Sequence, residues 1–258
     1  MGGSLIHRSL VPLLLVLFVV AMDTWLTRAY STDWDAPLYV GVYPINADGS
    51  AVVERYIDAL GEDDFEAIES FVKRETERYG KAIDRPVRMV LGATIDEQPP
   101  AIDPEPNVID IMLWSLRMRL WAGDVADGKE RYAPDVRIFV RYHDPDTTLR
   151  LENSVGIEKG MFGIVNAYAS RRLASQNNVI IAHEFLHTLG ATDKYDLATG
   201  QPIAPHGLAE PDSSPLYPQR YAEIMGGRIA LAPDDAVIPQ SLRYVLIGPL
   251  TAAEIRLT

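Results

Sequence analysis

Cysteine is absent from the 258-residue sequence, and this absence removes several kinds of chemistry at once. No disulfide can form, no thiolate can ligate zinc, and no cysteine can act as a nucleophile or cap a metal from a propeptide. Any metal must therefore be held by histidine, aspartate or glutamate. Histidine is also scarce, because only five occur: His7, His143, His183, His187 and His206.

Positive charge is the second shortage. The chain has 24 lysines and arginines against 36 aspartates and glutamates, which gives a formal net charge of −12. A nucleic-acid partner would require a basic stripe, so we expect no nucleic-acid binding. The length is enough for one large domain or for two small lobes around a cleft.

Long apolar runs are lacking except near the N-terminus, where residues 10–22 read LVPLLLVLFVVAM. This run follows Arg8 and is shorter than a spanning helix of about 20 residues, which favours a signal-peptide h-region. Trp25 and Leu26 can extend it into an uncleaved anchor over residues 10–26. A buried helix of the domain is the remaining alternative.

From this pattern we expect residues 1–35 to form a signal peptide or membrane anchor, followed by a polar tether over residues 28–36. The domain itself would then occupy residues 36–258 and lie outside the cytoplasm, in the periplasm or at the cell surface, either anchored or secreted.

Hydrophobic periodicity predicts a mixture of strands and helices in the domain. In the helix expected over residues 108–121, the side chains expected to point inward are Ile111, Met112, Trp114, Leu116 and Leu120. Thr251 is expected to cap a C-terminal helix, with Glu254 completing a capping box. The expected strands cover residues 38–44, 88–91, 136–142 and 156–169, and the expected helices cover 52–60, 63–79, 108–121, 171–189 and 251–257.

The segment 180–196, which reads IIAHEFLHTLGATDKYD, carries the clearest chemistry. On a helix, residues four apart lie on the same face, so His183 and His187 can present two imidazoles to one metal ion. Glu184 lies beside them, where a carboxylate can activate a water molecule. The alternative is a helix with two unrelated histidines and a solvated glutamate.

A catalytic zinc ion usually takes three protein ligands and leaves one position open. The candidates for the third ligand are Asp193, Asp196, His206, Glu210 and Asp212. Gly190 favours Asp193, because a glycine with positive φ can end the helix and turn the chain back toward the metal.

The motif HEFLHTLGATD resembles the extended zinc motif of the metzincin clan of metallopeptidases, in the branch with aspartate as third ligand (snapalysin-like). The resemblance assigns His183, His187 and Asp193 as ligands of Zn²⁺, Glu184 as the general base and Gly190 as the turn. It also places Met225 in a methionine turn beneath the metal, although a core methionine is the alternative. No specific family within the clan is assigned.

The resemblance implies an α+β, metzincin-like fold: a mixed twisted sheet, an active-site helix, a second long helix and a small irregular C-terminal lobe. The upper lobe would be residues 36–190 and the lower lobe 191–258. Strand-like residues 156–169 would receive an extended peptide substrate. The sequence identifies no separate donor to the scissile carbonyl; Tyr195 and Tyr221 are candidates, and the alternative is that both are packing residues.

The expected function is therefore that of an exported, zinc-dependent endopeptidase, a hydrolase in which a metal-activated water attacks the peptide bond and Glu184 accepts its proton. A zinc hydrolase of a non-peptide or cell-wall substrate is one alternative. A membrane-tethered binding module with structural zinc is the other.

Overall fold

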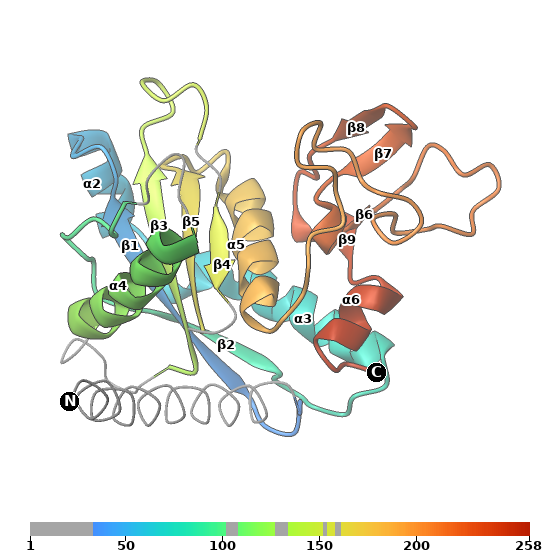
Figure 1. The fold of residues 1–258 in the computed structure, drawn as a ribbon, viewed down its shortest axis with the longest axis horizontal. Helices are drawn as coiled ribbons and strands as arrows, with labels where there is room; N and C mark the ends of the chain where they lie inside the picture. The colour runs from blue at the N-terminus through green and yellow to red at the C-terminus, as the bar shows by residue number, and fades with distance from the viewer. Residues whose placement is uncertain (1–32, 102–107, 127–133, 152–153, 158–160) are drawn as a thin grey trace, which may run out of the picture.

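The computed structural model describes residues 33–101, 108–126, 134–151, 154–157 and 161–258 (Figure 1). The elements, in chain order, are β1 (Leu38–Asn46), α2 (Ala51–Asp58), η1 (Glu62–Phe65), α3 (Glu66–Arg78), β2 (Val87–Leu91), α4 (Val108–Ala126), β3 (Val136–His143), β4 (Val155–Ile157), β5 (Phe162–Tyr168), α5 (Ala174–Thr188), β6 (Ala222–Glu223), η3 (Ile224–Gly226), β7 (Ile229–Ala232), β8 (Asp235–Val237), η4 (Leu242–Tyr244), β9 (Val245–Leu246) and α6 (Pro249–Glu254).

A five-stranded sheet in the order β2-β1-β3-β5-β4 forms the centre of the molecule. Strands β2, β1, β3 and β5 are parallel, whereas β4 pairs antiparallel with β5 at the edge. Parallel strands covered on both faces read as nearly continuous apolar runs, and this is the texture of β1 and β3. The architecture is a mixed α/β fold, consistent with the expected α+β class.

Alternation along the strands divides the core into two layers. Val42 and Ile138 belong to the larger core, together with buried residues of α2, α3 and α5. Tyr43 and Phe139 point to the other face and pack with residues of α4. Helix α5 therefore has the sheet on one side, and Figure 1 shows the C-terminal lobe beside it.

The orientation of helix α4 differs from the one expected for residues 108–121. It extends to Ala126, and Leu116 and Leu120 are 55% and 67% exposed instead of pointing inward. The buried stripe consists of Met118, Ala122 and Val125, with Trp114 partly buried against the same core. Because the helix is apolar around most of its circumference, its sequence does not identify the face that meets the sheet. The side chains of Ile111 and Met112 lie outside the described residues.

The C-terminal helix also begins differently from the expectation. Gly248 is the N-cap of α6 and Pro249 occupies its first turn, so the expected capping role of Thr251 is wrong. Thr251 lies inside the helix, where its hydroxyl donates to Glu223 Oε1 at 2.6 Å. The Thr251 hydroxyl thus bonds to a residue distant in sequence instead of capping its own helix.

The expected signal or anchor segment, residues 10–26, lies outside the described residues. The expected tether is described only from residue 33, and Trp34 is buried with its indole N–H donating to Ile255 O at 2.8 Å. The chain is therefore already part of the domain at Trp34. Within the described ranges, no helix is both long and apolar enough to cross a membrane.

Candidate metal centre

Helix α5 carries the two histidines and is fixed by its opposite face. Phe185 and Leu186 are fully buried in the larger core, as are Ile181 and Ala182. This packing leaves the side chains of His183 and His187 only 12% and 17% exposed on the neighbouring face, one turn apart. Their imidazole centroids are 4.7 Å apart and nearly perpendicular.

The chain reverses immediately after α5. Gly190 adopts φ 102°, a left-handed conformation that a residue with a Cβ rarely takes. The Ala191 N–H returns to Leu186 O at 3.1 Å, and the next residues run back along the helix. This reversal brings Asp193 to the two imidazoles.

Three donor atoms converge at this point. The distance between the Nε2 atoms of His183 and His187 is 3.1 Å. Asp193 Oδ1 lies 3.2 Å from His183 Nε2 and 3.0 Å from His187 Nε2. A tetrahedral zinc ion with ligand bonds of about 2.0–2.1 Å separates its ligands by about 3.3–3.4 Å, so the observed triangle is close to a zinc site.

The hydrogen bond at Nδ1 of each imidazole determines whether its Nε2 can act as a metal ligand. His183 Nδ1 lies 2.9 Å from Ile224 O, and His187 Nδ1 lies 2.8 Å from Ala191 O. A backbone carbonyl only accepts, so each Nδ1 carries a proton and each neutral ring presents an Nε2 lone pair. Two lone pairs and a carboxylate oxygen face one another at about 3 Å only with a positive charge between them, either a proton or a metal ion. The residues present therefore fit a zinc ion.

When the positive charge between these atoms is a proton, it also shifts the pKa values of the cluster. Burial lowers the pKa of His183, but its hydrogen bond to Asp193 and the charge of Glu184 outweigh burial and raise that pKa above its ordinary value. Burial raises the pKa of Asp193, but hydrogen bonds from both histidines hold that pKa well below its usual range. The cluster thus favours a negative aspartate beside a positive charge.

Glu184 and Tyr195 flank the cluster. Glu184 is 5% exposed, and its charge acts on both His183 and Tyr195. The Tyr195 ring lies 6.2 Å from the His183 ring. Burial, the charges of Asp193 and Glu184, and a hydrogen bond to Asp193 raise the pKa of Tyr195 to about 12. Its hydroxyl therefore stays protonated at neutral pH and can donate a hydrogen bond.

The turn that contains Met225 is joined to the cluster through backbone carbonyl groups. Ile224 supplies the carbonyl that accepts from His183, and Met225 O accepts from Lys194 N at 2.9 Å. The Met225 side chain is fully buried in the larger core. Glu223 is fully buried as well and accepts from Gly226 N, Gly248 N and the Thr251 hydroxyl. Burial raises the pKa of Glu223 despite these donors.

The other candidates for a third ligand lie elsewhere. Asp196 accepts from the Thr199 N–H and hydroxyl in a local turn, and Glu210 pairs with Arg220. His206 and Asp212 are exposed, and neither joins the three-residue cluster. Among the described residues, no second group of three such side chains comes together.

Sequence reasoning missed three residues around the site. Lys194, Glu223 and Glu254 are linked to it through hydrogen bonds that join segments many residues apart. Glu254, which the sequence pattern assigned to a capping box, instead accepts from Thr192 and Lys194. No local spacing distinguishes these carboxylates from the many surface ones.

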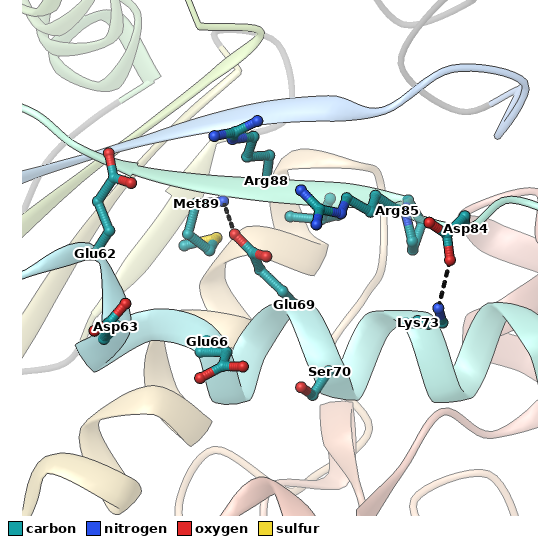
Figure 2. Close-up of a pocket in the computed structure, with 12 residues that line it drawn as sticks. Glu62, Asp63, Glu66, Glu69, Ser70, Lys73, Asp84, Arg85, Arg88 and Met89 are labelled. Atoms are coloured by element: carbon teal, nitrogen blue, oxygen red, sulfur yellow. Dashed lines mark hydrogen bonds and ion pairs between the residues drawn. The ribbon is translucent and has the colours of Figure 1, made fainter.

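A separate hollow of about 430 Å³ lies between α3 and β2 (Figure 2). Its walls carry charged side chains, but two of the carboxylates already have partners: Glu69 accepts from Met89 N at 2.7 Å, and Asp84 from Lys73 at 2.7 Å. None of the three cluster residues lines it. It is a charged surface hollow distinct from the metal cluster.

Comparison with known proteins adds little to this geometry. No family model and no curated protein matches the sequence. Among solved structures, the chain is similar to one described as "Structure of a chaperone-substrate complex", at a TM-score of 0.42 and 14% sequence identity. The match covers 86% of this chain but 33% of the other, so this chain spans about a third of that protein's length. A likeness this low carries no argument about function.

Proposed function

We propose that the protein is a zinc-dependent endopeptidase with a metzincin-like site. The observation that carries the proposal is the triangle of His183 Nε2, His187 Nε2 and Asp193 Oδ1, with sides of 3.0–3.2 Å and with both Nδ1 atoms turned to backbone carbonyls. This arrangement offers three ligands and leaves the fourth position of a tetrahedral ion for a water or a substrate.

Zn²⁺ held by these three side chains would supply Lewis acidity, which lowers the pKa of a water molecule and polarises a carbonyl group. Glu184 would accept the proton of the attacking water on its carboxylate and pass it to the leaving amine. The Tyr195 hydroxyl, protonated at neutral pH, would donate to the carbonyl oxygen as negative charge develops there. Ile224 O and Ala191 O keep the two imidazoles in the tautomer that ligates through Nε2.

The edge of the sheet offers further support for the same proposal. Strand β4 is antiparallel to its neighbour and lies at the edge of the sheet, shortly before α5 in the sequence. An edge strand can accept an extended peptide through backbone hydrogen bonds, which suits a peptide or protein substrate. The Ile224 carbonyl joins the turn around Met225 to His183, which is compatible with a methionine turn in the proposed site. An extracytoplasmic location, with a tether through residues 10–26, belongs to the proposal as well.

Metal content and hydrolysis, measured together, test this function. Purified full-length protein and the Glu184→Ala variant should each bind one zinc ion per chain, and only the wild type should cleave peptides. Absence of zinc from the wild type would refute the proposal. Zinc with cleavage only of non-peptide amides or esters would replace the peptidase by another hydrolase, and zinc without any hydrolysis would favour a binding module.

A further inference from the structure

A single carboxylate in the C-terminal helix holds both neighbours of the third ligand. Glu254 Oε2 accepts from Thr192 N at 3.0 Å and from Lys194 Nζ at 2.8 Å. Glu254 Oε1 accepts from the Thr192 hydroxyl at 2.6 Å. Asp193 lies between these two residues, so the segment is tied to α6 on both sides of the ligand.

Lys194 strengthens the link between this segment and Glu254. Its side chain is 5% exposed, and Nζ donates to Thr192 O at 2.9 Å as well as to Glu254. The Lys194 backbone N–H donates to Met225 O at 2.9 Å, which joins the same segment to the turn around Met225. A buried ammonium requires a compensating charge, and Glu254 supplies it.

The Asp193 side chain is more exposed than those of the two histidines. It is 34% exposed, compared with 12% for His183 on α5. Its side-chain partners, His183, His187 and Tyr195, all belong to the site. The backbone of residues 191–194 therefore sets where Asp193 Oδ1 meets the two imidazoles. That backbone follows a glycine with positive φ, so contacts beyond the turn must define its path.

We propose that Glu254 is a positioning residue for the metal centre: by holding Thr192 and Lys194, it sets where Asp193 Oδ1 lies relative to the two imidazoles. Glu254 does not itself join the ligand cluster. The inference rests on the proposed zinc site, and it assigns to the C-terminal helix a role in metal affinity. Groups that orient ligands in this way typically contribute 10- to 100-fold to metal affinity.

The test compares zinc affinity in full-length variants by competition with a chromophoric chelator. In Glu254→Gln, one carboxylate oxygen is replaced by an NH₂ group, which donates where three other donors already converge. We therefore expect zinc to bind about 10- to 100-fold more weakly than in the wild type. Thr192→Val removes only the hydroxyl contact, and we expect a smaller weakening, of several-fold. Cobalt(II) substitution should give a visible spectrum that changes in Glu254→Gln, because that spectrum reports ligand geometry and not overall stability.

Glu210→Gln is the matched control. Glu210 also accepts from three donors, all of them on Arg220, and it lies in the same lobe. It has no contact with residues 192–194 among its hydrogen bonds, so its variant should bind zinc and cobalt as the wild type does.

Wild-type zinc affinity and an unchanged cobalt spectrum in both Glu254→Gln and Thr192→Val would overturn the positioning role. If Glu254→Gln does not fold, Thr192→Val decides by the same criterion. A wild type that binds no zinc refutes this inference together with the zinc site. A wild type that binds zinc but cleaves no peptide refutes only the peptidase, and the affinities of the variants still decide the role of Glu254.

Discussion

Glu223 offers the sharpest test of how the C-terminal lobe is held. Its carboxylate is fully buried and accepts from Gly226 N at 2.8 Å, Gly248 N at 3.0 Å and the Thr251 hydroxyl at 2.6 Å. Each hydrogen bond to a charged group contributes about 1.5–3 kcal/mol, whereas burial of a carboxylate costs several kcal/mol. We therefore expect Glu223→Ala to lower the free energy of unfolding by a net ~3–5 kcal/mol.

Glu223→Gln separates hydrogen bonding from charge. Its oxygen can still accept from Gly248 and Thr251, but its amide nitrogen faces the Gly226 N–H, so one buried donor loses its acceptor. That loss costs about 1–3 kcal/mol, and removal of the buried charge offsets part of it. The glutamine variant should therefore be clearly more stable than the alanine variant in urea unfolding monitored by circular dichroism.

The Glu223→Ala substitution should also affect the candidate metal site. The turn that Glu223 holds also carries Ile224 O, the acceptor for His183 Nδ1. We expect Glu223→Ala to weaken zinc binding by about tenfold or more, measured on folded protein below the urea transition. Glu77→Ala, at a side chain that is 58% exposed on α3, should leave both quantities unchanged. An alanine variant as stable as the wild type would show that the buried carboxylate does not hold this lobe, and the reasoning would be wrong.

Three further outcomes are expected. Tyr195→Phe should retain zinc but lose about 10²–10³-fold in kcat, because one donor to the developing oxyanion is removed; an unchanged kcat would exclude that role. Hydrogen bonds to Lys194 and Thr192 outweigh burial and lower the pKa of Glu254, so its contribution to stability is present above about pH 4.5 and is lost as the pH falls below that value. The stability difference between wild type and Glu254→Gln should therefore shrink in acid unfolding series, and a difference independent of pH would contradict the assignment. Trp34→Ala should cost about 3–5 kcal/mol in urea unfolding, because the indole is buried and donates to Ile255 O; a loss below 1 kcal/mol would place Trp34 outside the cooperative unit.

The sheet could be predicted from the sequence because its strands are apolar and rich in β-branched residues. Residues 38–44 and 136–142 were expected as strands, and β1 and β3 cover them with one or two more residues. The order of the strands in the sheet could not be predicted, because it depends on how the connecting segments pack in the tertiary fold. The inward face of α4 was predicted wrongly for Leu116 and Leu120, because both faces of that helix are apolar.

The residues of the candidate site were also predicted only in part. His183, His187 and Asp193 lie within eleven residues of sequence, and the structure brings them together. Helical spacing predicted the pairing of the histidines, whereas Gly190 only favoured Asp193 among five candidates and the metzincin resemblance assigned it. Glu223 and Glu254 reach the site only because the chain returns to it from the C-terminal lobe. Contacts of this kind depend on the tertiary fold, and a capping pattern at Thr251 and Glu254 was misleading because both side chains have distant partners.

The closeness of the three cluster residues in sequence also limits what a bound metal could do for folding. Loop-closure entropy grows only with the logarithm of loop length, so an ion that joins residues 183, 187 and 193 restricts the unfolded chain very little. Its contribution to stability would come from binding the native state alone, and it would scale with the concentration of free metal. Contacts such as the hydrogen bond from Trp34 to Ile255 O, between residues that are 221 positions apart, instead join distant parts of the chain. Removal of a bound metal would therefore loosen the segment around Asp193 locally and leave the sheet and the Trp34–Ile255 contact intact.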